Sequence, residues 1–379
     1  MSNYEHITTP DALADLCERL AGSPWLTVDT EFVRERTYYA ELSLIQIGND
    51  TIFACIDPLA ISNLQPLAEL LGNPGTIKIF HAADQDVEIL SRALGVMPLP
   101  LFDSQAAATL LGLGNQIGYA NLVQSLLGVE LDKSQTRIDW NQRPLSDAAL
   151  EYAADDVRYL AQIYPMLVDQ LESRGRRSWL QPELDKLSDP ARYNIQPEDA
   201  WAKLRGFHKL KPRAQNVARL LAGWRETQAK DRNRPRGHIV RDDLLLDLAI
   251  RQPSNKGALA KARGIPDGIL RHHADTLLGL IADGQALPPP ELPARPKALN
   301  SQQEVLAQIM LAIVQIRANA EEIAPNQLAT RKEIDALIRG NRELPMLDGW
   351  RKAVVGDLLL QAAEGEMTLN VQNGEVSLA

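Results

Sequence analysis

The chain has 379 residues, of which 45% are hydrophobic and 23% are charged, and its formal net charge is −9. These values are typical of globular proteins and exclude fibrous repeats and wholesale disorder. No run of 18 apolar residues predicts a bilayer-spanning helix, and no secretory signal is visible, so we expect a cytosolic protein without a membrane partner. Its two cysteines, Cys17 and Cys55, are too few for a disulfide framework and are expected to pack as small apolar side chains.

Charge is distributed unevenly along the chain. Residues 1–200 carry 14 basic and 29 acidic residues, whereas residues 201–260 carry 14 basic and 5 acidic ones. A basic block within an acidic chain favours a polyanionic partner, because Lys and Arg displace counterions from phosphates. A solvated basic face with no ligand is the alternative interpretation.

The first 115 residues predict a mixed α/β arrangement. Strands are predicted by runs rich in β-branched residues at Trp25–Val28, Leu42–Ile47, Ile52–Ile56 and Thr76–Phe80. Helical periodicity is found at Asp11–Leu20, Leu64–Leu71, Val87–Leu94 and Ser104–Leu111. Short connections predict an antiparallel meander for the first three strands. The fourth strand follows a helix, which predicts a parallel crossover and hence a mixed sheet.

The rest of the chain is predicted to be helical. One long helix is expected over Leu145–Leu171, with Ser146 as its N-cap. Residues 182–197 contain three prolines and predict a linker, and the proline-rich residues 287–296 predict a stiff extended spacer. Beyond the spacer, residues 299–363 are expected to be helical. Their predicted core face carries Val305, Ile309, Ala312, Ile313 and Ile316.

Acidic residues stand at three places in the predicted α/β part. Asp29 and Glu31 end the first strand, and residues i and i+2 of a strand face the same side, so both carboxylates point one way. Like charges repel there, but a hard cation would bind both. A pair of exposed strand-end acids is the alternative interpretation.

Two further acidic pairs follow. Asp84 and Asp86 open the helix after the fourth strand, where either could be a simple cap. In the long helix, Tyr152 and Asp156 share one face at i and i+4, whereas Asp155 points about 100° away and is expected to be solvated or paired. A surface hydrogen bond between Tyr152 and Asp156 is the alternative. If the three clusters converge, their carboxylates repel one another unless cations neutralise them. We therefore predict a two-metal site of the kind that serves phosphoryl displacement.

Several motifs together resemble ribonuclease D. The first runs from Asp29-Thr30-Glu31 to Leu42-Ser43-Leu44-Ile45-Gln46, the second is His81-Ala82-Ala83-Asp84-Gln85-Asp86, and the third is Tyr152-Ala153-Ala154-Asp155-Asp156. Leu131-Asp132-Lys133-Ser134 and Asp139-Trp140 also match. Further along, Leu221-Ala222-Gly223-Trp224-Arg225-Glu226 and Asn233-Arg234-Pro235 resemble the helical domain, called HRDC, that RecQ-type helicases share with ribonuclease D.

This resemblance implies a ribonuclease-H-like α/β exonuclease domain with a mixed sheet, followed by two small all-α domains. The expected boundaries are 1–180 for the exonuclease domain, 181–209 for a linker or helical connection, 210–290 for the first HRDC domain, 291–298 for the proline-rich spacer and 299–379 for a divergent second copy. The implied activity is 3′→5′ hydrolysis of RNA to nucleoside 5′-monophosphates, with precursor tRNA as a substrate and no obligate protein partner.

The resemblance also implies roles for individual residues. Asp29, Glu31, Asp86 and Asp156 match the acids that hold two divalent ions, Mg²⁺ or Mn²⁺, and Tyr152 matches the residue that orients the attacking water. Only the family spacing selects Asp86 over Asp84. Candidate substrate contacts are Gln46, His81, Lys133, Arg137 and Trp140 near the terminal nucleotides, and Arg232, Arg234 and Arg236 at backbone phosphates. An exonuclease acting on DNA and a non-catalytic RNA-binding adaptor are the alternatives.

Overall fold

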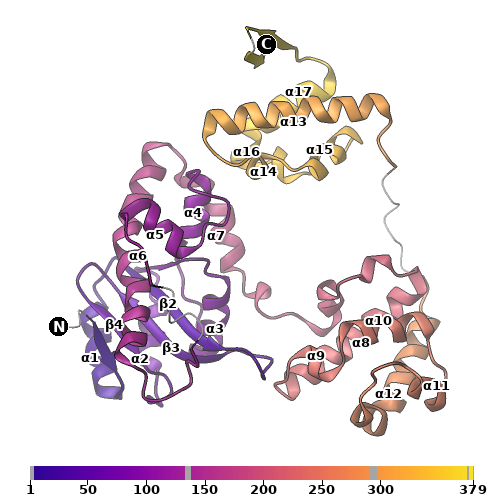
Figure 1. Cartoon of the computed structure of the whole chain (residues 1–379), viewed down its shortest axis with the longest axis horizontal. Helices are drawn as coiled ribbons and strands as arrows, with labels where there is room; N and C mark the ends of the chain where they lie inside the picture. Colours follow the sequence, from indigo (N-terminus) through magenta and orange to yellow (C-terminus); the bar gives the residue numbers. More distant parts are fainter. Residues whose placement is uncertain (1–3, 133–137, 290–296, 374, 379) are drawn as a thin grey trace.

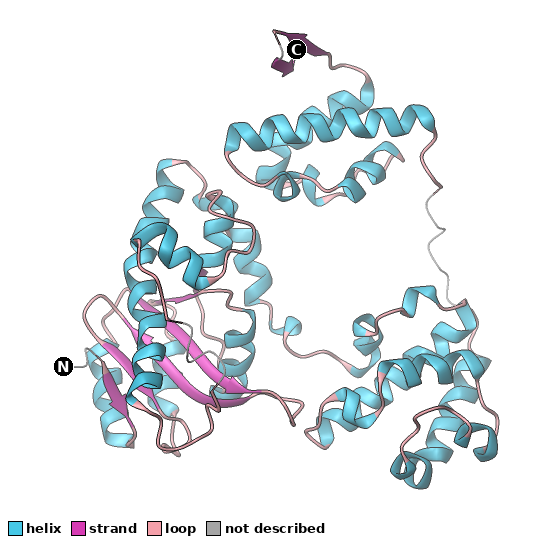
Figure 2. Cartoon of the chain, in the orientation of Figure 1, coloured by secondary structure: helices cyan, strands magenta, loops and turns pink. Residues whose placement is uncertain are grey.

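The computed structural model describes residues 4–132, 138–289, 297–373 and 375–378. An α/β part, drawn in indigo to magenta, is followed by two separate helical parts (Figure 1). Figure 2 shows that the long strands all belong to the first part. Among the helices in the described ranges, none is both long and apolar enough to cross a membrane.

A six-stranded mixed sheet forms the centre of the α/β part, in the order β1-β4-β3-β2-β5-β6. Its strands are β1 (Glu5–Ile7), β2 (Trp25–Val33), β3 (Glu41–Gly48), β4 (Phe53–Ile56), β5 (Ile77–Phe80) and β6 (Leu101–Asp103). Strands β2, β3 and β4 form the predicted antiparallel meander, and β5 pairs with β2 in parallel, as the crossover predicts. The edge strands β1 and β6 were not predicted, because three residues are too few for a periodic signal.

Helices cover both faces of the sheet. They are α1 (Pro10–Leu20), α2 (Gln65–Gly72), α3 (Asp84–Leu94), α4 (Ser104–Leu110), α5 (Tyr119–Leu127) and α6 (Asp147–Ser173). Leucines of α1 and α2 share one buried cluster with Leu26 and Val28 of β2. On the opposite face, Leu150 and Ala153 of α6 pack with Leu44 and with Cys55. Both cysteines are free and buried, as expected.

Helix α6 and strand β2 meet in a way that fixes which side chains face each other. The predicted N-cap is confirmed, since the Ser146 hydroxyl accepts the backbone N–H of Ala149 at 3.2 Å. The Thr27 hydroxyl of β2 donates to the carbonyl of Val157 of α6 at 3.1 Å. Because strand side chains alternate, Asp29 and Glu31 also face α6, whereas Thr30 faces α3.

The predicted linker after α6 contains regular structure. Helix α7 (Gln181–Ser188) lies within it, and its Leu184 and Leu187 pack against the α/β core. Pro182 stands in the first turn of α7, where a backbone N–H would have no acceptor within the helix, so proline is tolerated there. Proline content alone therefore does not predict that this segment lacks a helix. Short 3-10 turns follow at Pro190–Arg192, Pro197–Lys203 and Phe207–Lys209.

Five helices form the first helical part: α8 (Pro212–Asp231), α9 (Arg236–Ile239), α10 (Asp242–Arg251), α11 (Lys256–Ala260) and α12 (Asp267–Ala286). Its own buried core includes Val217 and Leu221 of α8 with Leu245 and Leu277. Helices α8 and α12 approach closely at Gly284, where a Cβ would lie 2.8 Å from the Val217 backbone. Most of the predicted spacer, residues 290–296, lies outside the described residues.

The C-terminal part is helical as predicted, but its core face differs. It contains α13 (Ser301–Glu321), α14 (Pro325–Leu328), α15 (Arg331–Ile338), α16 (Gly349–Arg351), a π-helical turn (Lys352–Gly356), α17 (Asp357–Glu364) and an unpredicted hairpin of β7 (Leu369–Gln372) and β8 (Glu375–Leu378). Met310, Ile313 and Val314 of α13 are buried, whereas Val305 is 57% exposed and Ile309 is 38% exposed. The prediction is thus confirmed for Ile313 and wrong for Val305 and Ile309, because apolar residues occupy two sides of α13 and periodicity alone does not select between them.

This C-terminal part contacts the α/β part directly. The indole rings of Trp179 and Trp350 are stacked, with centroids 4.4 Å apart and planes inclined by 6°. Arg176 forms an ion pair of 2.8 Å with Glu321 at the end of α13. Gly112 sits so close to Glu322 that a Cβ there would lie 1.8 Å from the Glu322 carbonyl oxygen, and its φ of +77° is itself unfavourable for other residues.

Candidate active site

Three carboxylates from β2 and α6 converge on the face of the sheet that α6 covers. One oxygen atom from each of Asp29, Glu31 and Asp156 can be chosen so that all lie within 4.8 Å of one another. The alternation of β2 turns the first two toward α6, and the third stands on the helix face that meets them. Such a cluster offers the oxygen ligands that hard divalent cations prefer.

The fourth predicted acid comes from the opposite face of the sheet. Asp86 stands in the first turn of α3, is 8% exposed, and accepts a hydrogen bond of 2.6 Å from the Thr30 hydroxyl. Asp84, the competing candidate, is exposed and pairs with Arg192. The structure therefore places Asp86 rather than Asp84 beside the carboxylate cluster.

Burial, together with the charges of neighbouring carboxylates, raises the pKa of all four carboxyl groups. Burial, followed by the charges of Asp86 and Asp156, holds the pKa of Asp29 well above its usual range. Burial, followed by the charges of Asp29 and Asp86, raises the pKa of Glu31 to about 9, and burial is the main reason that the pKa of Asp86 rises to about 7. The pKa of Asp156 also lies well above its usual range, because of burial and then the charge of Glu31. A cation would remove this repulsion, so the donor set fits divalent metal ions.

Tyr152 lines a cavity of about 340 Å³ together with Asp29, Glu31 and Asp156. It lies one helical turn before Asp156, and burial followed by the nearby carboxylates raises the pKa of its hydroxyl. Asp155 points elsewhere and pairs with Arg158. Of the two expectations for Asp155, solvated or paired, the structure shows the second.

Sequence reasoning missed Tyr119 at the wall of this cavity. Its hydroxyl donates to the backbone carbonyl of Asp156 at 2.5 Å and lies 3.1 Å from that of Asp155. It thereby ties the start of α5 to the α6 turn that carries the acid. Nothing in the local sequence marks it, because the contact joins residues 37 positions apart.

Similarity to known proteins extends along the whole chain. A family model described as a 3′-5′ exonuclease matches residues 4–172, and one described as an HRDC domain matches residues 214–281. Ribonuclease D of Zymomonas mobilis is 39% identical, with 100% of this chain and 98% of the relative covered. Ribonuclease D of Sphingobium indicum is 40% identical, with coverages of 100% and 99%.

The chain belongs to the ribonuclease D family.

A solved structure leads to the same assignment. The crystal structure of Escherichia coli RNase D, described as an exoribonuclease involved in structured RNA processing, matches with a TM-score of 0.81 and 33% identity. The match covers 96% of this chain and 99% of that one. The protein is thus a 3′-5′ exoribonuclease, and the predicted fold class, an α/β exonuclease domain followed by helical domains, is confirmed.

Among the predicted substrate contacts that fall within the described residues, only His81 lines the cavity that contains Asp29, Glu31 and Asp156. Its Nδ1 lies 2.9 Å from the Ser104 hydroxyl, and its Nε2 lies 3.0 Å from the Ile117 carbonyl. Burial lowers the pKa of the imidazole, which is therefore neutral near pH 7. Its two ring nitrogens are thus occupied by protein partners rather than free for a substrate.

Gln46 and Trp140 need correction, because both are too buried to contact a substrate at the surface. Gln46 is 0% exposed, and β3 places it opposite Asp29 in the β2–β3 register, beneath α6. Trp140 is 5% exposed and packs with Leu44, its ring centroid 6.3 Å from that of Tyr152. A base cannot stack on an indole that is already covered. The predicted contacts Lys133 and Arg137 lie outside the described residues.

The basic loop of the HRDC domain is only partly available to phosphates. Arg236 is bound to Glu226, a buried residue of α8, and to the Tyr38 hydroxyl, which corrects its prediction as a freely presented side chain. Arg232 lies 2.7 Å from Nε2 of His273. Arg234 is exposed and, within the described ranges, its side chain forms no hydrogen bond or ion pair.

Proposed function

We propose that Asp29, Glu31, Asp86 and Asp156 bind two divalent ions, Mg²⁺ or Mn²⁺, and that Tyr152 orients the attacking water. The observation that carries this proposal is the convergence of Asp29, Glu31 and Asp156 within 4.8 Å, with Asp86 held beside them by Thr30. Asp29 would contact both ions, Glu31 and Asp156 would complete one site, and Asp86 would serve the other. Divalent ions, when bound, supply positive charge that lowers the pKa of a water and stabilises a leaving oxygen.

Each side chain of the site has its own role in hydrolysis. The cavity admits the 3′-terminal nucleotide so that its phosphodiester lies against the acids. Tyr152 keeps its proton at neutral pH, because its pKa is raised, and it hydrogen-bonds the attacking water rather than removing a proton. Thr30 and Tyr119 hold Asp86 and the α6 turn in place. Attack at phosphorus breaks the bond to the 3′-oxygen of the preceding nucleotide and releases a nucleoside 5′-monophosphate.

Precursor tRNA with a 3′ extension is the proposed substrate, and the protein would act on it in the cytosol. Support comes from the full-length likeness to ribonuclease D and from the basic HRDC domain beside the exonuclease domain. The proposed domain limits remain those expected above, with residues 299–379 as a divergent second HRDC copy.

Release of mononucleotides from 3′-extended tRNA tests this function. We expect stepwise shortening with Mg²⁺ or Mn²⁺ and none with a chelator. A DNA strand of the same sequence, offered in competition, separates the two polymers, because only a pocket that reads the 2′-hydroxyl can distinguish them. Preferential digestion of DNA, or binding of RNA without any release of nucleotides, would overturn the proposal.

A further inference from the structure

A second cavity, of about 600 Å³, lies where the exonuclease domain meets the first helical domain. Its walls come from the loop after β2, the first turns of α3, residues 192–195, and helices α8 and α9. It is distinct from the cavity that holds the acids, and no residue lines both.

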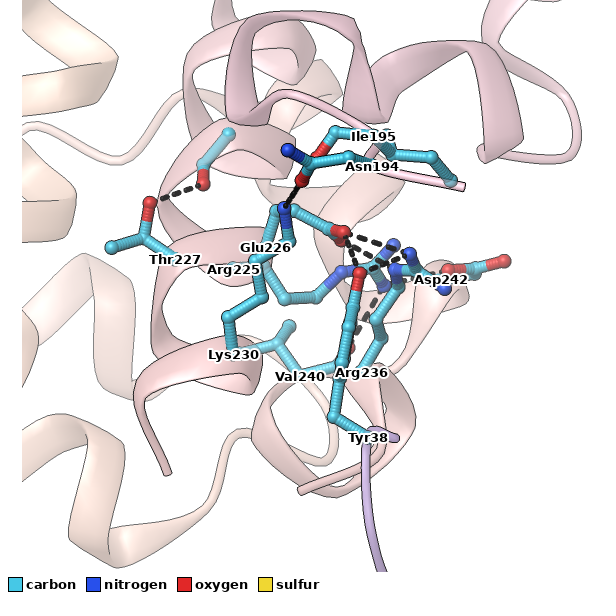
Figure 3. A network of polar contacts seen from close by, with 11 residues as sticks. Tyr38, Asn194, Ile195, Arg225, Glu226, Thr227, Lys230, Arg236, Val240 and Asp242 are labelled. Atoms are coloured by element: carbon cyan, nitrogen blue, oxygen red, sulfur yellow. Dashed lines mark hydrogen bonds and ion pairs between the residues drawn. The ribbon is translucent and has the colours of Figure 1, made fainter. Parts of the chain in front are cut away.

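The walls of this junction cavity are held in place by a polar network (Figure 3). The Tyr38 hydroxyl donates to Glu226, which is completely buried, and Arg236 binds both of them. The Asn233 side-chain oxygen also accepts the backbone N–H groups of Tyr38 and Tyr39, each at 3.1 Å. Because the network joins the two domains, the cavity is present before any ligand binds.

Positive charge predominates on the lining. Five basic and three acidic side chains line the cavity, but Arg34 is paired with Glu88, and Arg192 with Asp84. Arg236 is likewise committed to Glu226. Two lysines and one glutamate remain, namely Lys203, Lys230 and Glu35.

Neither lysine has a carboxylate hydrogen-bonded to it in the described part of the chain. The ammonium group of Lys230 donates to the Ile195 carbonyl and lies 3.3 Å from the Asn194 side-chain oxygen, which leaves its third N–H unused. Figure 3 shows its side chain reaching toward Asn194 from α8. Lys203 is exposed and forms no hydrogen bond or ion pair with an acid in the described part of the chain. An ammonium group with spare donors is a suitable partner for a phosphate oxygen.

The cavity lies close to the acids along two elements. On α3, Asp84 and Glu88 line the cavity and flank Asp86 in sequence. On the β2 side, Arg34 follows Glu31 by three residues, which corresponds to about 10 Å of extended chain. Short stretches of β2 and α3 thus connect the acids with the cavity, and this connection is the basis for placing an upstream phosphate of a bound RNA there.

We propose that the junction cavity binds a backbone phosphate of the RNA on the 5′ side of the bond that is cut, through Lys203 and Lys230. The inference rests on the proposed function, since it takes the RNA 3′ end to lie at the acids. Contact with phosphate alone would be independent of base sequence and sensitive to salt. It would also make affinity depend on substrate length, because a very short RNA cannot span both sites.

Steady-state kinetics on single-stranded RNAs of 2 to 12 nucleotides test the proposal with the variants Lys203→Gln, Lys230→Gln and the double variant. For long RNAs we expect the double variant to raise KM about 5–10-fold with kcat unchanged, whereas dinucleotide kinetics stay at wild-type values. Lys261→Gln is the matched control, because Lys261 is an exposed lysine of the same domain that does not line the cavity.

Binding measured without turnover provides an independent readout. Fluorescence anisotropy of a labelled 12-nucleotide RNA in the presence of a chelator should show weaker binding by the double variant. The slope of log K against log salt should fall by about 0.7 for each lysine lost. Since the side chain of Lys203 is exposed and has no partner among the described residues, Lys203→Gln alone keeps the test valid if Lys230→Gln disturbs folding.

Equal KM values for variants and wild type at every length, or the same loss with the dinucleotide, would overturn the phosphate site. Loss of affinity for Lys261→Gln as large as for the cavity variants would also overturn it. Failure of the wild-type enzyme to hydrolyse RNA is a different result, because it contradicts the proposed function while leaving the anisotropy comparison intact.

Discussion

The hydroxyl of Tyr38, in the loop between β2 and β3, donates a hydrogen bond to the carboxylate of Glu226, which is completely buried on α8. This contact joins the strand pair that carries Asp29 and Glu31 to the HRDC domain. Arg236 supplies the charge that stabilises the buried carboxylate.

Replacing Glu226 should therefore loosen the junction between the two domains. Glu226→Gln is expected to reduce the free energy of unfolding by about 1–3 kcal/mol, because it leaves Arg236 without its anionic partner. Tyr38→Phe, which removes the hydroxyl that contacts Glu226 and Arg236 but keeps the backbone bonds to Asn233, should cost about 1 kcal/mol. Denaturant unfolding and hydrogen exchange over residues 34–40 would measure both. Glu198→Gln, at an exposed glutamate, is the control. Equal exchange in all three variants would contradict a junction role.

The same junction should weaken in acid. Burial acts to raise the pKa of Glu226, but hydrogen bonds from Arg236 and Tyr38 outweigh it, so the pKa lies below the ordinary value of 4.5. A carboxyl whose pKa is lowered by folding contributes stability that is present above about pH 4.5 and is lost as the pH falls through the folded pKa. Small-angle scattering from pH 7 to 3.5 should show the domains separating, with Glu226→Gln lacking this acid step.

Metal binding at the acids should be visible as thermal stabilisation. At an ion concentration 100 times the Kd, one bound ion adds about 2.7 kcal/mol. Asp29→Asn is expected to abolish this rise in Tm and to lower turnover by about 10³-fold or more, while the metal-free protein unfolds at the wild-type Tm or higher because a repulsive charge is gone. Asp155→Asn should keep both turnover and the metal response, since Asp155 pairs with Arg158 instead. Wild-type rates in Asp29→Asn would rule out its assignment as a ligand.

Tyr152→Phe separates orientation of water from metal binding. We expect kcat on a dinucleotide to fall by about 10²-fold, with the metal-induced rise in Tm preserved, because the hydroxyl is lost and the carboxylates remain. Tyr159→Phe, on the same helix but outside the cavity, is the matched control and should leave kcat and the metal-induced rise in Tm unchanged. A loss of metal response in Tyr152→Phe would instead indicate a structural role.

Gly112 provides a test of how the C-terminal part is docked. Gly112→Ala would force a Cβ onto the Glu322 carbonyl and should release the C-terminal part, together with the stacking of Trp179 on Trp350. Gly128→Ala carries the same penalty for a positive φ but meets nothing within 4 Å, so it isolates the cost of the backbone conformation, about 1–2 kcal/mol. Tryptophan fluorescence and limited proteolysis would distinguish the two variants. Identical behaviour would show that the close approach is not required for docking.

Much of the fold follows from local pattern, since β-branched runs and helical periodicity predict the four central strands and α6 with its Ser146 cap. The same patterns fix the directions of Asp29, Glu31 and Asp156 on their own elements, and the packing of α6 over β2 then brings the three side chains together. By contrast, the bonds of Tyr119 to Asp156 and of Tyr38 to Glu226 join distant residues of ordinary type. Nothing in composition or spacing marks such tertiary contacts.

Burial explains the remaining differences. Gln46 and Trp140 belong to motifs that resemble those of ribonuclease D, but only the packing of α6 over β3 shows that both side chains are buried. Arg236 belongs to a basic run, and only its distance to Glu226 shows that its charge is already neutralised. A linear sequence gives the charge of a side chain but not which neighbour it faces.

Thr30 stands between two of the acids on β2 and points the other way, toward Asp86. A single strand thus supplies contacts to both layers of helices, through neighbouring residues. Inserting or deleting one residue in β2 ahead of Asp29 would exchange these directions, turning a hydroxyl toward α6 and the carboxylates toward α3. The length of β2 ahead of Asp29 is therefore fixed by the two opposite directions in which its side chains must point.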